Sequence, residues 1–313
     1  MTSERLVRGE PIVETGTVTR AAPNPVAQIV LSSRPVSWIN TAFPFAAAYL
    51  LTTGAVDALF IVGTLFFLIP YNLLMYGVND VFDYESDLRN PRKGGTEGAL
   101  LEPGLHRIVV WSGIATAAPL LAAMLWLGGT GHPWSWVVLA VSLFAVFAYS
   151  VPGLRFKERP VLDSITSSTH FVSPAVYGLA VAGAVPTPQL IALLAAFFCW
   201  GMASHAFGAV QDIVPDREGG IASIATAFGA RATVRLALGL WILAGLLMLV
   251  TEWPGPLAAL LVVPYLAAAW PYRSVTDADS GAANRGWRRF IVLNYVVGFL
   301  VTMLLIWWAL VRS

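Results

Sequence analysis

The chain contains nine long apolar stretches, and these constrain its fold more than any other feature. They cover residues 36–56, 58–79, 107–128, 134–151, 161–184, 189–211, 232–251, 256–271 and 289–311. A helix needs about 20 mainly apolar residues to cross the hydrocarbon core of a bilayer. Charged residues make up only 12% of the sequence, about half the share that is usual in a soluble domain. The sequence therefore predicts an all-α integral membrane protein with nine transmembrane helices.

Basic residues lie almost entirely on one side of these stretches. All 19 Lys and Arg residues except Arg312 fall before the first stretch or after an even-numbered one. Because positive residues stay on the cytoplasmic side, we expect a multi-pass protein of the cell membrane with its N-terminus in the cytoplasm and its C-terminus on the opposite side. Residues 1–35 are polar and predict a cytoplasmic tail before one domain over residues 36–313. The net charge of +1 gives no reason to expect nucleic acid as a partner.

A first group of acidic residues follows the second apolar stretch, at its expected cytoplasmic end. If the helix continues through Asp80, Asp83 and Asp87, the three carboxylates lie within roughly 60° of one another around its axis. On the same helix Asn72, Tyr76 and Asn79 extend this polar stripe toward the membrane.

A second group follows the sixth stretch, where Asp212 and Asp216 are four residues apart and Pro215 lies between them. His205 is expected on the same helix face, about two turns deeper. Two groups of carboxylates with nearby cations suit Mg²⁺, which binds through one or two carboxylates together with water and phosphate. The plainer interpretation is that these are solvated acids at helix ends. The repetition of the pattern beside basic residues favours a functional site.

The two groups resemble the motifs of a known family. Asn79-Asp80-x-x-Asp83-x-x-x-Asp87 is similar to the NDxxDxxxD motif of the UbiA superfamily of intramembrane prenyltransferases, and Asp212-x-x-x-Asp216 is similar to its second motif, DxxxD. The order of nine spans, with the motifs after the second and sixth, also resembles that family.

This resemblance implies a Mg²⁺-dependent prenyltransferase with nine helices around a central cavity that opens to the cytoplasmic side. Its donor would be an isoprenyl diphosphate. The implied metal ligands are Asp80, Asp83, Asp87, Asp212 and Asp216, of which Asp80, Asp83 and Asp212 would be catalytic. The implied substrate-binding residues are Asn72, Asn79, Arg34, Arg92, Lys93, Tyr149, Arg155, Lys157, His205 and Arg217. The aromatic faces of Tyr76, Tyr149, Phe171 and Phe207 are candidates to stabilise an allylic cation.

Two histidines are candidates for removing a proton from the product cation. His170 lies near the middle of the fifth stretch, beside Ser167, Ser168 and Thr169, and His205 lies just before the second acidic group. Either residue could instead make only a hydrogen bond between helices.

The acceptor is indicated by finer similarities. The segments 33–38, 79–93 and 149–160 resemble the lycopene elongase branch, which builds C50 carotenoids. That resemblance implies a dimethylallyl donor, lycopene as a hydrophobic acceptor from the lipid bilayer, and a carotenoid cyclase as a possible partner. The alternatives are transfer to an aromatic quinone precursor such as 1,4-dihydroxy-2-naphthoate, or a membrane transporter. A transporter would place its acids near the bilayer midplane, whereas these lie at one surface.

Overall fold

The structure is a computed structural model that describes residues 24–88 and 100–312, and all regular secondary structure in those residues is helical. The helices of the first part are α1 (Pro25–Ser32), α2 (Trp38–Thr53), α3 (Ala58–Leu68), α4 (Pro70–Asn72), α5 (Val78–Phe82), α6 (Tyr84–Asp87), α7 (His106–Gly128), α8 (Pro133–Ser150) and α9 (Leu162–Val181). The second part contains α10 (Pro188–Val210), α11 (Ile213–Glu218), α12 (Ile224–Phe228), α13 (Ala230–Met248), α14 (Val263–Ala269) and α15 (Asn284–Arg312).

Seven helical segments of the described chain are long and apolar enough to cross a membrane. They are Ala58–Phe82, Pro103–Gly128, Pro133–Ser150, Pro188–Val210, Ala230–Met248, Gly255–Tyr272 and Ser280–Arg312. Each coincides with one of the predicted apolar stretches. The chain is therefore a multi-pass membrane protein.

The two other predicted stretches correspond to α2 and α9, which differ from the rest for separate reasons. Helix α2 has only 16 residues, and this is short for a complete crossing. Helix α9 has 20 residues but carries many polar ones, and most of its residues are buried. It packs against α2, α8 and α10. Its side chains therefore contact other helices, whereas many side chains of an outer helix contact lipid. Nine spans remain a prediction.

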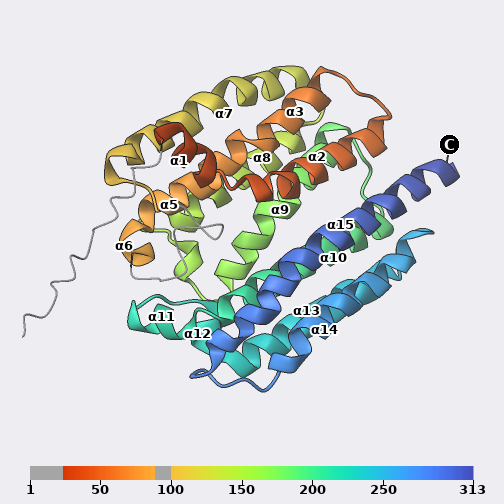
Figure 1. Cartoon of the computed structure of the whole chain (residues 1–313). Helices are drawn as coiled ribbons and strands as arrows, with labels where there is room; N and C mark the ends of the chain where they lie inside the picture. Colours follow the sequence, from red (N-terminus) through yellow and green to blue (C-terminus); the bar gives the residue numbers. More distant parts are fainter. Residues whose placement is uncertain (1–23, 89–99, 313) are drawn as a thin grey trace, which may run out of the picture.

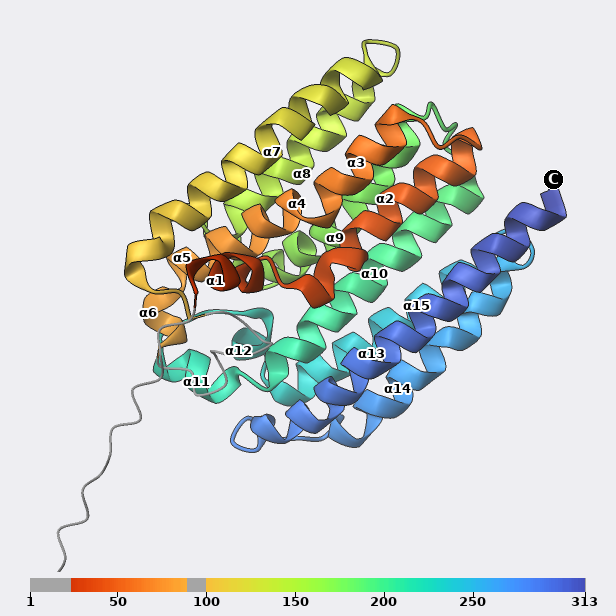
Figure 2. The same cartoon turned by 45° about the horizontal axis from the view of Figure 1, so that its top comes forward.

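The helices form two packed groups that meet along α9 and α10 (Figures 1 and 2). The first group contains α2, α3, α7, α8 and α9, and its core is built on aromatic residues such as Phe45, Phe67 and Tyr177. The second group contains α10, α13, α14 and α15, and its core surrounds Trp241 and Phe290. Both groups line one central cavity, with residues from α2 and α9 on the first group and from α10 and α15 on the second.

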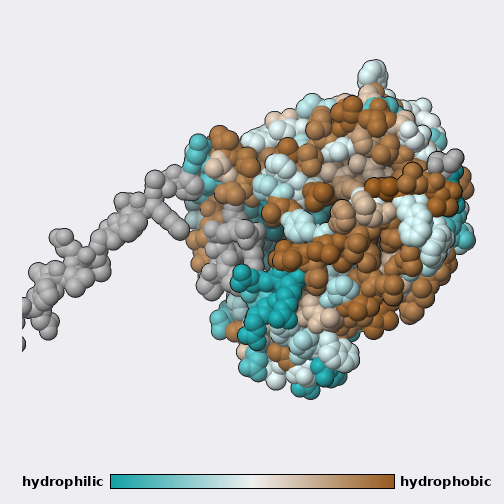
Figure 3. Space-filling view, turned by 45° about the vertical axis from the view of Figure 1, so that its right-hand side comes forward, coloured by the Kyte–Doolittle hydropathy of each residue, from teal (hydrophilic) through white to brown (hydrophobic). Residues whose placement is uncertain are grey.

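Hydrophobic side chains cover much of the outer surface, as a lipid-facing protein requires. On the face shown in Figure 3 they cover much of the surface, and the largest cluster of strongly hydrophilic residues lies left of and below the centre of the view. Exposed apolar residues are frequent on α15, where Val292, Phe299 and Leu310 are each more than half exposed. The predicted tail over residues 1–35 is helical over α1, which packs beside the Leu73–Gly77 segment.

Candidate active site

The helix before the first acidic group is not a continuous α-helix. A π-helical turn occupies Leu73–Gly77, between α4 and α5. A π-turn inserts an extra residue, which rotates the later turns of a helix relative to the earlier ones. As a result Tyr76 and Asn79 line the central cavity, but Asn72 does not. The fully buried Asn72 amide donates to Thr41 Oγ1 at 2.7 Å and to the carbonyl of Phe67 at 2.9 Å. The structure therefore gives Asn72 contacts within the protein in place of the predicted substrate contact.

The predicted carboxylate stripe is also interrupted. Helix α5 ends at Phe82, and Asp83 is its C-terminal cap, with its N–H donating to the carbonyl of Asn79 at 2.9 Å. Helix α6 then begins at Tyr84, so Asp87 does not continue the helix that carries Asp80. Asp80 and Asp83 are 1% and 8% exposed, which is rare for carboxylates unless they are paired.

Cations from two distant segments supply that pairing. Arg34, just before α2, places Nη2 3.1 Å from Asp80 Oδ1, and its guanidinium lies 4.3 Å from the centre of the Tyr76 ring. Lys157, in the loop after α8, forms an ion pair with Asp83, and Arg155 lies 3.8 Å from the same carboxylate. Burial lowers the pKa of Lys157 to about 8, against the opposing effect of the Glu158 and Asp80 carboxylates. The first acidic group therefore lies in a partly buried, cation-rich pocket.

The two arginines of this pocket have an uncommon backbone conformation. Arg34 and Arg155 have φ values of 49° and 39°, in the left-handed region that costs a residue with a side chain of order 1–3 kcal/mol. Each begins a 3₁₀ turn, at Pro35–Ser37 and Phe156–Glu158. The fold thus holds the backbone of both arginines in this conformation at a cost, which is typical of functional sites.

The second acidic group follows the end of α10 and lines the same cavity. Helix α10 ends at Val210, and Asp212 caps the short helix α11 that contains Asp216. Pro215 lies in the first turn of α11, where proline is tolerated because the N–H groups there have no helical acceptor. Asp212, Asp216 and Asp83 all line one cavity. The structure therefore places on the wall of one cavity the two acidic groups that the sequence separates by more than a hundred residues.

The side chain of Arg217 pairs with residues other than the two acidic groups. Its guanidinium lies 2.7 Å from Asp277 Oδ2 and donates to the carbonyl of Thr226 at 2.8 Å, with its side chain 46% exposed. The N–H of Ala230 and the Arg217 guanidinium hold the pKa of Asp277 below its usual value. Arg217 therefore connects α11 to α12 and to the loop before α15, where the sequence predicted a contact with substrate.

Polar contacts join the cavity wall behind the first acidic group. Ser150 donates to Asn79 Oδ1 at 3.0 Å. The Tyr149 hydroxyl lies 3.3 Å from Nε2 of His205, and the Ser164 hydroxyl lies 3.0 Å from its Nδ1. Both ring nitrogens of His205 are thus engaged in contacts between α8, α9 and α10, although the residue also lines the cavity.

One buried acid was missed by the sequence analysis. Asp163 is fully buried at the start of α9 and accepts the N–H of Ser164 and the N–H of Ile224, both at 2.7 Å. Residues on either side of Gly220, in the segment that Asp163 anchors, line the cavity. The only signal in the sequence was an isolated acid at the start of a mostly uncharged stretch. Asp163 fixes the loop that follows the second acidic group.

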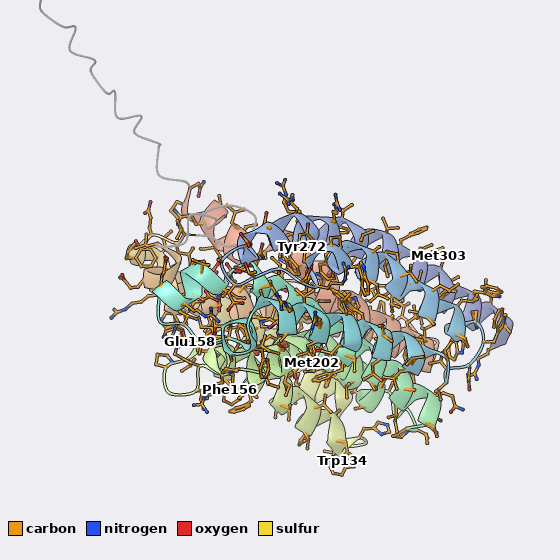
Figure 4. All side chains as sticks on the ribbon, turned by 90° about the horizontal axis from the view of Figure 1, so that it is seen from below. Trp134, Phe156, Glu158, Met202, Tyr272 and Met303 are labelled. Atoms are coloured by element: carbon orange, nitrogen blue, oxygen red, sulfur yellow. The ribbon has the colours of Figure 1, made fainter. Side chains whose placement is uncertain are left out.

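The cavity has a volume of about 2190 Å³ and extends far beyond the acidic groups. Its lining on α10 runs from Gln189 to Ala209, about 30 Å along the helix at a rise of about 1.5 Å per residue. Apolar and aromatic side chains of α2, α9, α10 and α15 form most of this wall, including Phe43, Phe171 and Trp200. Figure 4 places Glu158 at the end of the bundle that carries α11, with Met303 toward the other end.

Of the four predicted aromatic faces, three lie on the cavity wall. Tyr76, Tyr149 and Phe171 line the cavity. Phe207 is 1% exposed and packs in the second core, with its ring 5.8 Å from that of Trp241. Phe207 is therefore a core residue.

The carboxylates that line the cavity suit a divalent metal ion that is also bound by substrate phosphate. No group of three or more His, Cys, Asp or Glu side chains in the described residues is arranged to hold a metal ion alone. Mg²⁺ does not require such a group, because water and substrate phosphates complete its coordination. Carboxylates from two separate segments line one cavity and could supply the remaining oxygens. The side chain of Asp87 and the residues Arg92 and Lys93 lie outside the described part of the structure.

Comparisons with known proteins identify the family. The model of the UbiA prenyltransferase family matches residues 41–294. The lycopene elongase/hydratase of Corynebacterium glutamicum is 49% identical over 278 residues, covering 89% of this chain and 96% of that protein. The C(50) beta-cyclic carotenoids biosynthesis protein LbtBC of Dietzia sp. (strain CQ4) is 52% identical over 292 residues, covering 93% of this chain and 67% of that protein. The family resemblance of the two acidic motifs is confirmed.

Solved structures support the same fold. A UbiA homolog from Archaeoglobus fulgidus bound to DMAPP and Mg²⁺ has a TM-score of 0.62 and 19% sequence identity, covering 86% of this chain and 98% of that one. A UbiA homolog from Archaeoglobus fulgidus bound to GPP and Mg²⁺ has a TM-score of 0.59 and 18% sequence identity. The helical arrangement described above is thus shared with proteins of low sequence identity.

Proposed function

The chain belongs to the UbiA prenyltransferase family, and from this premise we propose that it transfers a dimethylallyl group from dimethylallyl diphosphate to lycopene. Prenyl transfer follows from the family. The donor and the acceptor are the finer part of the proposal, and two relatives that are 52% and 49% identical carry names from C50 carotenoid synthesis and lycopene elongation. Two successive additions would give C45 and C50 products.

The length and apolar character of the cavity are the observations that support lycopene as the acceptor. Its wall along α10, from Gln189 to Ala209, is about 30 Å long, which matches the thickness of about 30 Å of a bilayer core. An aromatic quinone precursor is small and polar, and its pocket would need hydrogen-bonding groups around the ring. A long hydrocarbon needs an extended apolar channel and few polar contacts. The cavity of this chain is of the second kind. Most of its charged groups lie at the end beside Asp83 and Asp212, and the ion pair of Arg312 with Glu252 lies at the far end of α15.

The charged end of the cavity would hold the diphosphate. Arg34, Lys157 and Arg155 now neutralise Asp80 and Asp83, and their donor groups suit phosphate oxygens as well as carboxylates. Negative charge builds up on the diphosphate as the C–O bond breaks, so fixed cations there stabilise the transition state. Tyr76 and Tyr149 would face the allylic cation beside this end, and the apolar wall would keep water away from it.

The metal of this proposal is Mg²⁺. Asp83 with Asp80 and Asp87 on one side, and Asp212 with Asp216 on the other, would hold it together with the diphosphate. When bound, Mg²⁺ supplies Lewis-acid stabilisation of the leaving group.

We further propose nine spans, with α2 and α9 completing the seven, and a cavity whose charged end faces the cytoplasm. The distribution of basic residues supports this orientation. After replacement of Cys199 by serine, a single cysteine at Ser274 is expected to react with a membrane-impermeant maleimide only from the cytoplasmic side. A cysteine at Thr130 is expected to react only from the opposite side. The reverse labelling pattern would overturn the orientation.

The proposed reaction is tested with membranes that contain the chain, labelled dimethylallyl diphosphate and one acceptor at a time. With lycopene and Mg²⁺ we expect C45 and C50 products, and chelation of divalent metal with EDTA should abolish them. Prenylation of 1,4-dihydroxy-2-naphthoate with no change in lycopene would contradict the proposed acceptor. The carotenoid cyclase suggested by the sequence resemblance does not enter this proposal.

A further inference from the structure

We propose that His170 accepts the proton that is released when the cation formed on the acceptor becomes an alkene. This inference rests on the proposed transfer to a hydrocarbon acceptor. His170 lies near the middle of α9, is 3% exposed and lines the central cavity. Neither of its ring nitrogens has a hydrogen-bond partner within the described part of the chain. Buried polar side chains are nearly always paired, so a cavity-lining imidazole with two unpaired nitrogens points to a task involving a ligand.

A comparison with the other buried histidine separates the two candidates. His205 uses both ring nitrogens, one near the Tyr149 hydroxyl at 3.3 Å and the other near the Ser164 hydroxyl at 3.0 Å. A neutral imidazole has one acceptor nitrogen and one N–H, so these two contacts occupy its whole hydrogen-bonding capacity. His170 keeps its acceptor nitrogen available. The proton-accepting role therefore falls to His170, and His205 positions Tyr149.

His170 is held at the boundary between the charged and apolar parts of the cavity. Its ring meets the edge of the Tyr149 ring at a centroid distance of 5.4 Å, and Tyr149 adjoins Ser150, which binds Asn79 beside the first acidic group. Behind it, the Tyr71 hydroxyl lies 3.5 Å from the His170 carbonyl oxygen.

Further hydroxyls fix this arrangement. Ser142 donates to the Tyr71 hydroxyl at 3.1 Å, and Ser173 donates to Ser142 at 2.8 Å. These buried contacts join α4, α8 and α9. The imidazole is therefore set on a rigid backbone, as a group that takes a proton at a defined position needs to be.

The chemistry of the step balances without a further reagent. The C–O bond of the donor breaks, and its electron pair leaves with the diphosphate. The terminal double bond of the acceptor forms the new C–C bond and leaves a tertiary cation on the acceptor. A neighbouring C–H bond then supplies its electrons to a new C=C bond, and the proton passes to the available nitrogen of His170. If this transfer fails, the cation persists until water captures it and gives an alcohol.

The test compares the products of His170→Ala and His170→Asn with those of the wild-type chain, using dimethylallyl diphosphate and lycopene in membranes. We expect both variants to lose about 100-fold or more in the rate of product formation. We also expect the ratio of alkene to hydroxylated product to fall, while the KM for the donor changes by less than about 3-fold. Asparagine can make hydrogen bonds but cannot accept the proton, so it should not restore the alkene.

The matched control is His132→Ala, an identical substitution at an exposed histidine before α8, which should keep the wild-type rate and ratio. An unchanged product ratio in the His170 variants, or recovery of wild-type behaviour by asparagine, would show a structural role and overturn the inference. If wild-type membranes convert no lycopene, the proposed function fails, and this inference fails with it. Conversion by the wild type with normal products from His170→Ala overturns the inference alone.

Discussion

Asp83→Ala and Asp212→Ala are each expected to lower the rate of prenyl transfer by about 10³-fold or more, while the protein remains folded in the membrane. The two carboxylates line the same cavity, Asp83 at the end of α5 and Asp212 at the start of α11, and in the proposed function both are needed to hold the metal and diphosphate. The loss should appear in kcat/KM for the donor and should not be recovered by raising the Mg²⁺ concentration. Asp80→Ala is expected to behave similarly, because Asp80 anchors Arg34.

The matched control for these variants is Asp279→Asn. Asp279 is an exposed acid in the loop before α15, where it accepts the Thr276 hydroxyl at 2.6 Å. The Asp279→Asn substitution should leave the rate of prenyl transfer unchanged. Thermal unfolding in detergent separates lost chemistry from lost fold, and near-normal turnover by either Asp83→Ala or Asp212→Ala would contradict the assignment of the acidic groups.

Arg34→Ala is expected to raise the KM for dimethylallyl diphosphate by about 30-fold or more, a free energy of roughly 2 kcal/mol or more. The variant removes a cation that is held over Tyr76 and beside Asp80. Asp80 is then left buried with less compensation, so some stability should also be lost. The measurement is steady-state kinetics at saturating acceptor, together with the unfolding temperature of the variant.

Arg217→Ala provides the contrast. Both arginines were predicted from the sequence to bind substrate, but Arg217 contacts Asp277 and the Thr226 carbonyl. Its removal should change the donor KM by less than about 3-fold, since exposed ion pairs contribute little. If the two arginine variants proved equally impaired, the placement of Arg34 as the donor-binding residue would lose its support.

The membrane architecture and the acidic groups could be predicted from local sequence, because both depend on neighbouring residues. Apolar length predicts a spanning helix directly, and it identified the seven segments that meet the length and hydropathy requirement. Helix α9 shows the limit of that rule, since a helix surrounded by other helices can carry serine and threonine in place of apolar residues. The convergence of Asp83 with Asp212 was predicted through the family motifs.

The side-chain contacts that depend on helix register or on residues far along the chain could not be predicted from local sequence. The π-helical turn at Leu73–Gly77 rotates Asn72 away from the face of Asn79, and no residue in that segment signals such a turn. The direction of Arg217 depends on Asp277, sixty residues later. The difference between His170 and His205 depends on whether a hydroxyl from another helix reaches the ring, which only the packed structure reveals.

Pigment analysis of lycopene-producing cells tests the central claim most directly. Cells that express the wild-type chain should accumulate C45 and C50 carotenoids at the expense of lycopene. Cells that express Asp83→Ala at the same level should retain lycopene. Unchanged lycopene in both strains, with the wild-type protein folded in the membrane, would contradict the account.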